Sequence, residues 1–142
     1  MKEQIHINGE LCAIVISASY DVPGIHFFTS NELSQQLASM SYTTGKVIPP
    51  HTHNPARREV TYTQEVLFIR KGKVRIDFYS RKQEYCTSRV LSTGDVILLI
   101  SGGHGFEVLE DLNMIEVKQG PYIGDTDKTI FETVSPLKLR FE

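Results

Sequence analysis

The chain has 142 residues, which is enough for one domain with its own core and without disulfide support. Hydrophobic residues make up 40% of it, and the net charge of −2 argues against a protein that follows a nucleic-acid backbone. Its two cysteines, Cys12 and Cys86, lie far apart and are expected to be reduced thiols. The first residues lack the layout of a signal peptide or a membrane span, so we expect a cytoplasmic protein with neither a nucleic-acid nor a membrane partner.

Short apolar or alternating segments separated by turn residues dominate the chain, and this pattern predicts an all-β sandwich or barrel. The expected strands cover residues 4–8, 11–18, 37–44, 46–53, 60–70, 73–80, 86–91, 96–100, 104–109, 113–118 and 130–134. Thr29 and Glu32 have the spacing of a capping box, which predicts a helical turn over residues 31–36. An extended lead-in to the next strand is the alternative for the same residues.

Two turns are predicted from glycine. Residues 70–73, with Gly72, lie between two apolar runs and predict a hairpin in which the glycine has a positive φ. Residues 93–95, with Gly94, separate two further strands in the same way.

The segment GKVIPPHTH, residues 45–53, contains a histidine pair. Pro49 and Pro50 force an extended backbone before it. In an extended strand His51 and His53 point to the same side, which is a common beginning of a site for zinc, iron, manganese, copper or nickel. An isolated HxH is also common on protein surfaces.

The next strand carries a carboxylate in a position that periodicity alone leaves undecided. Glu65 is in phase with Leu67 and Ile69, so it faces the interior if these two side chains do. A cation would then offset the cost of burying its charge. With Val66 and Phe68 inward instead, Glu65 faces solvent.

A further candidate, His104, lies among three glycines just before an apolar strand. It shares one side of that strand with Phe106 and Val108. Such a histidine is either a core residue with its own hydrogen-bond partners or a metal ligand.

In combination these residues resemble the two motifs of the cupin family. Gly45, His51, His53, Glu65 and Gly72 follow the first motif, and Gly94, Asp95, Gly102 and His104 follow the second. The resemblance covers about residues 36–118 and implies a single domain, a double-stranded β-helix or jelly-roll barrel with at most one or two helical turns. Residues 1–30 and 119–142 would pack on this barrel or on a partner. It also implies one divalent ion (Zn, Fe, Mn or Ni) held by His51, His53, Glu65 and His104.

The sequence departs from the family pattern in several places. Eleven residues separate His53 from Glu65, more than the first motif has there, which implies an enlarged loop over the cavity. Glu59 is the alternative carboxylate, although it lacks the spacing to Gly72. In the second motif Ile100 replaces the usual proline and Val108 the terminal asparagine.

Single-domain cupins include oxygenases, isomerases, lyases and non-catalytic ligand sensors, so the family alone does not determine the activity. We expect a metal-dependent enzyme for a small molecule. The alternatives are a metal-free sugar isomerase or epimerase, in which His51 and His53 act as acid and base, and a non-catalytic binding or sensor protein. Tyr62 is a further catalytic candidate. A homodimer is expected, because open sheet edges are commonly covered by a second copy.

Several polar residues are candidates for contacts with an anionic or carbohydrate-derived ligand. Arg57 and Arg58 on the enlarged loop have the chemistry to hold a carboxylate or phosphate, or they form a solvated loop. The remaining candidates are Gln64, Lys118, Tyr122 and Lys128. Residues 117–128 resemble a segment of small cupins associated with polysaccharide or nucleotide-sugar genes, although the same residues would also suit an edge or a dimer contact.

Overall fold

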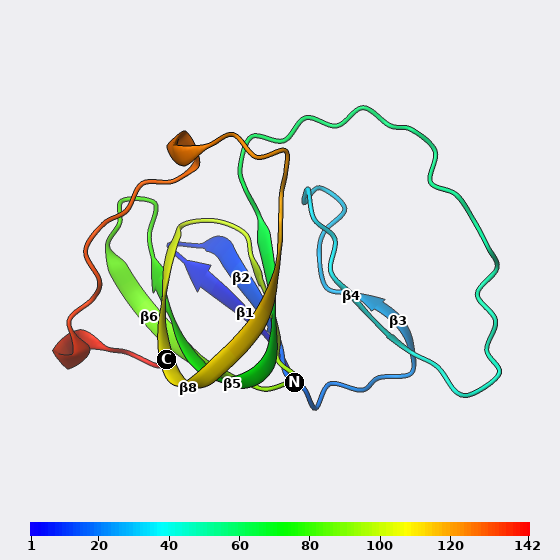
Figure 1. The fold of residues 1–142 in the computed structure, drawn as a ribbon, viewed down its shortest axis with the longest axis horizontal. Coiled ribbons are helices and arrows are strands. Elements are labelled where there is room, and N and C mark those ends of the chain that lie inside the picture. The colour runs from blue at the N-terminus through cyan, green and yellow to red at the C-terminus, as the bar shows by residue number, and fades with distance from the viewer. The chain divides into compact units, whose positions relative to one another are not determined.

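Eight antiparallel strands carry most of the regular structure, and all residues from Met1 to Glu142 are described in a computed structural model (Figure 1). The chain divides into a larger unit, Met1–Tyr20 with Thr63–Glu142, and a smaller unit, Asp21–Tyr62. Helical structure is limited to two single 3-10 turns, η1 (Asp125–Asp127) and η2 (Pro136–Lys138). None of the helical segments has the length and apolar character needed to cross a membrane.

The larger unit is one antiparallel sheet of six strands. Five of them follow the order β1-β2-β7-β5-β6, and β8 pairs with β5. Their bounds are β1 Lys2–Ile7, β2 Glu10–Ile16, β5 Glu65–Tyr79, β6 Tyr85–Ser92, β7 Val96–Leu99 and β8 Gly103–Lys118.

This sheet is strongly curled into a half-barrel (Figure 1). Arg89 on β6 donates to Glu3 on β1 at 2.7 Å, although these strands lie at opposite ends of the five-strand order. The inward side holds the core, with Val74, Ile76 and Leu67 almost fully buried. β8 has β5 as its only strand partner, so its second edge stays unpaired within this unit.

Burial settles the phase of the strand that begins at Glu65. Leu67 and Ile69 are 1% and 0% exposed, whereas Phe68 is 40% exposed. Leu67 and Ile69 belong to the core cluster, and Glu65 is in phase with them. The phase with Val66 and Phe68 inward is therefore excluded for this strand.

The predicted hairpin at residues 70–73 is wrong, because β5 runs through it for 15 residues. Instead the pairing with β8 shifts register three times between Ile69 and Val74. Gly72 does adopt the predicted positive φ, at 93°. A Cβ there would lie 2.1 Å from the carbonyl oxygen of Asp111 on β8, so the bulge depends on glycine.

Other boundaries also differ from the predictions. The two strands predicted at 104–109 and 113–118 form the single strand β8. The turn predicted at Gly94 is confirmed, because this glycine has a positive φ between β6 and β7. Residues 130–134 contain no strand, because the segment bonds to the side chain of Tyr79 rather than to a sheet edge.

The smaller unit has a two-stranded sheet of β3 (Gly24–Phe27) and β4 (Ala38–Ser41), of which β3 was not predicted. Residues 31–36 form turns, not a helix, and Thr29 uses its hydroxyl to donate to Gln36. The strand predicted at 46–53 is not formed within this unit, where Pro49 and Pro50 have no N–H to donate.

Candidate functional site

An open cavity of about 650 Å³ lies in the larger unit, at the ends of β5 and β8. The ionisable residues of its lining include Glu65, His104, Glu116, Lys118 and Asp127. The segment 127–133 forms a further part of the wall. The volume is within the range of small-molecule sites, and the mixed charges suit a polar ligand.

A bend in the paired strands β5 and β8 brings two of these residues together. In the strand register Glu65 lies opposite Lys118, at one end of β8, whereas His104 lies opposite Phe78, near the other end. Nevertheless His104 Nε2 is 3.4 Å from Glu65 Oε2. The pair therefore meets because the two-stranded ribbon bends (Figure 1), and the register shifts around Gly72 lie between its two halves.

Glu65 is held in its ionised form by its neighbours. Its side chain is 18% exposed, and His104 lowers the pKa of its carboxyl below the ordinary value. Burial acts in the opposite direction but is outweighed, and Glu116 and Lys118 lower the pKa of Glu65 further. The cavity therefore contains a carboxylate and an imidazole in contact, which is a combination suited to metal binding or to proton transfer.

The lowered pKa of Glu65 predicts a loss of stability in acid. A carboxyl whose pKa is lower in the folded state stabilises the protein above its unfolded pKa of about 4.3, and this contribution disappears as pH falls through the folded pKa. Urea unfolding of metal-free protein between pH 6 and 3 should therefore show a wild-type advantage over Glu65→Gln that shrinks below about pH 4.3. An advantage that grows in acid would contradict the assignment.

His51 and His53 lie side by side in the smaller unit. Their ring centroids are 5.3 Å apart, with the planes at 74°. His51 Nδ1 is 3.0 Å from the carbonyl oxygen of Pro49, a geometry that suits the tautomer with the proton on Nδ1. In that neutral tautomer Nε2 has the lone pair that a metal would use, as in histidine ligands oriented by a backbone carbonyl.

The donors fit a transition metal chemically, but they are divided between the units. The larger unit contributes the Glu65–His104 pair and the smaller one the His51–His53 pair. Neither unit by itself gathers three or more metal-ligating side chains around one point. Glu59, the alternative carboxylate, is exposed in the smaller unit.

The remaining candidates divide in the same way. Lys118 and Lys128 line the cavity, whereas Tyr122 is 75% exposed and does not line it. Gln64 is buried, and its backbone carbonyl oxygen accepts a hydrogen bond from the backbone N–H of Gln119. Arg57, Arg58 and Tyr62 lie exposed in the smaller unit.

Sequence reasoning missed Glu116 and Asp127. Glu116 lies opposite Leu67 in the strand register, so it faces the same side as Glu65. Its spacing of two from Lys118 was a usable signal, because strand residues two apart share a side. Asp127 lies 3.8 Å from Lys118 Nζ and accepts a hydrogen bond from the Thr63 hydroxyl at 3.3 Å. Thr63 and Asp127 are 64 residues apart in the sequence, so no local pattern indicates their contact.

Comparison with known proteins identifies no relative: the chain matches no family model, no curated protein and no solved structure.

Proposed function

We propose that this protein is a metal-dependent cupin that acts on a small polar molecule in the cavity of the larger unit. The observation that carries the proposal is the contact between Glu65 and His104, 3.4 Å apart in the lining of a cavity of about 650 Å³. One residue comes from each motif of the cupin resemblance. In this proposal His51 and His53 supply the other two ligands.

The chemistry of the four side chains supports one divalent ion. Three imidazoles and one carboxylate are the donors that zinc, iron, manganese and nickel accept in proteins. The ionised state of Glu65 and the Nδ1-protonated tautomer of His51 are the forms that bind a metal. A metal bound in this way would supply a Lewis acid with coordination positions left for the ligand.

The half-barrel supports the jelly-roll part of the proposal. β8 is 16 residues long and pairs on one side only. On its inward side Phe106 is 41% exposed and Val108 is 57% exposed. Their partners in the strand register, Ile76 and Val74 on β5, are fully buried core residues. A barrel closed by a further strand would pair this edge and cover these side chains.

The cavity residues suggest how a ligand would be held. Lys118 offers a positive charge to an anionic group, and Glu116 on the same side of β8 accepts from hydroxyl groups. The Glu65–His104 pair would remain beside the ligand as the group able to hold or move a proton.

Metal content of the purified protein tests this proposal. After expression with zinc, iron, manganese and nickel, we expect about one ion per chain in the wild type and at least a tenfold loss in Glu65→Gln, His104→Ala and His51→Ala. Elemental analysis with size-exclusion chromatography measures both metal content and folding. Glu59→Gln is the matched control for the carboxylate, and His26→Ala, in the smaller unit, is the control for the histidines.

Two results would contradict the proposal. The first is wild-type protein that stays metal-free under these conditions while its circular dichroism shows a folded state. The second is a Glu65→Gln variant that keeps its metal while Glu59→Gln loses it. Turnover of a nucleotide sugar by chelated protein would instead support the metal-free isomerase.

A further inference from the structure

The C-terminal segment 128–142 forms a wall of the cavity before it crosses the larger unit. Six consecutive residues of it line the cavity, from Lys128 to Thr133. Asp127, just before them, is held near β8 by Lys118 and by the Thr63 hydroxyl. The wall therefore starts from a fixed point and continues into a segment with no strand or long helix of its own.

Tyr79, the last residue of β5, anchors the far end of this wall. The amide of Val134 donates to Tyr79 Oη at 3.0 Å. The ring of Phe131 contacts the Tyr79 ring edge to face, with centroids 5.0 Å apart at 84°. Gly103 makes room for this contact, because a Cβ there would lie 2.8 Å from Phe131 Cζ.

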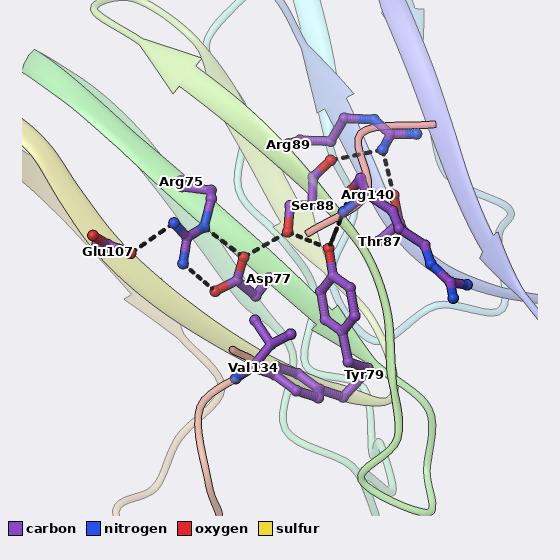
Figure 2. Close-up of polar contacts among 10 residues, drawn as sticks. Arg75, Asp77, Tyr79, Thr87, Ser88, Arg89, Glu107, Val134 and Arg140 are labelled. Carbon is purple, nitrogen blue, oxygen red and sulfur yellow. Dashed lines mark hydrogen bonds and ion pairs between the residues drawn. The ribbon is translucent and has the colours of Figure 1, made fainter. Parts of the chain in front are cut away.

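A second anchor lies on β6, around Tyr85. Its hydroxyl accepts from the amide of Arg140 at 2.8 Å, and the amide of Ser88 donates to the Arg140 carbonyl at 2.6 Å. Thr87 donates to the carbonyl of Glu142 at 2.8 Å. Figure 2 shows this end of the chain lying against β6 above the buried side chains of β5.

Apolar burial between the anchors is small. Val134 is the only buried residue after Lys118, whereas Ile130 and Leu137 are 89% and 96% exposed. Polar contacts of this kind each add little net stability, since water offers the same bonds. A segment held in this way opens locally far more often than the sheet beneath it unfolds.

We propose that residues 128–142 are a movable strap that narrows access to the cavity, and that Tyr79 is the positioning residue that holds the strap in place. Opening at Tyr79 frees Phe131 and the wall residues next to His104, and a small molecule enters. Closing returns the Phe131 ring to Gly103 and covers the ligand. Movement of the strap requires the cavity but no metal ion. A failed test of the strap therefore does not affect the proposed metal-dependent function, and the reverse also holds.

The test uses full-length, metal-free protein and two variants that loosen the first anchor in different ways. Tyr79→Phe removes the hydroxyl and keeps the ring, and Gly103→Ala displaces Phe131 and keeps the hydroxyl. Tyr122→Phe, at an exposed tyrosine, and Gly105→Ala, where a Cβ has no contact closer than 3.9 Å, are the matched controls. Hydrogen exchange reports on strap opening, and the rate of His104 modification by diethylpyrocarbonate reports on cavity access, with His26 of the same sample as the reference.

We expect exchange of the Val134 amide to be about 3- to 10-fold faster in Tyr79→Phe and Gly103→Ala, as loss of one net hydrogen bond predicts. His104 modification should accelerate with it, while both controls behave as the wild type. Unchanged exchange would show that Tyr79 does not hold the strap. Faster exchange with unchanged His104 modification would show that the strap does not narrow access to the cavity. Either result overturns the proposal.

Discussion

Replacing Asp77 by asparagine is expected to lower the free energy of unfolding by about 3–5 kcal/mol, as removal of one partner from a buried ion pair does. Asp77 is 1% exposed and accepts from Arg75 at 2.8 and 3.0 Å, and Arg75 is itself 6% exposed (Figure 2). Asp77 raises the pKa of Arg75 further, so the guanidinium cannot lose its charge to reduce the cost. The Asp77 carboxylate accepts from three donors, which are two nitrogens of Arg75 and the Ser88 hydroxyl. An asparagine has only one acceptor oxygen and would place an NH₂ group against one of these donors.

Urea unfolding measures this effect, and Glu107→Gln is its control. Glu107 contacts the same guanidinium at 2.6 Å but is 54% exposed, so its replacement should cost at most about 1 kcal/mol. Replacing both partners, with Arg75→Met and Asp77→Leu, should restore much of the stability lost in the single variant, because no unpaired charge stays buried. Equal losses for Asp77→Asn and Glu107→Gln would contradict the assignment.

The strands were predictable where side-chain periodicity and turn residues agree. The apolar segments around Ile14, Ile76 and Leu98 became strands, and Gly94 made the expected turn between two of them. The bulge at Gly72 was predicted as a hairpin, because a glycine with positive φ serves both structures. Only the approach of Asp111, which is distant in sequence, distinguishes the two.

Only part of the candidate site was predictable. The HxH spacing indicated that His51 lies beside His53, whereas periodicity left the phase of Glu65 open, and only the burial of Leu67 and Ile69 decides it. The contact of Glu65 with His104 follows from the bend of β5 and β8, which no local pattern encodes. The buried Arg75–Asp77 pair was also missed, since alternating charged residues in a strand usually indicate a solvated side.

Gly72→Ala is expected to lower the free energy of unfolding by about 2–5 kcal/mol, the sum of about 1–2 for a left-handed backbone and about 1–3 for overpacking. Its φ is 93°, and the added Cβ would lie 2.1 Å from the backbone oxygen of Asp111. Gly9→Ala separates the two contributions, because Gly9 has a φ of 79° but no atom within 4 Å of an added Cβ. We therefore expect a loss of about 1–2 kcal/mol in Gly9→Ala, measured by urea unfolding of both variants.

Gly72→Ala should also change the geometry of the cavity, whereas the Gly9→Ala control should leave it unchanged. The register shifts around Gly72 lie between the halves of the ribbon that carry Glu65 and His104. If β8 must move away from residue 72, the two side chains separate, and the lowered pKa of Glu65 should return toward its ordinary value. NMR titration of the Glu65 carboxyl in wild type, Gly72→Ala and Gly9→Ala measures this directly. An unchanged titration in a destabilised Gly72→Ala protein would show that the bulge stabilises the sheet without positioning the site.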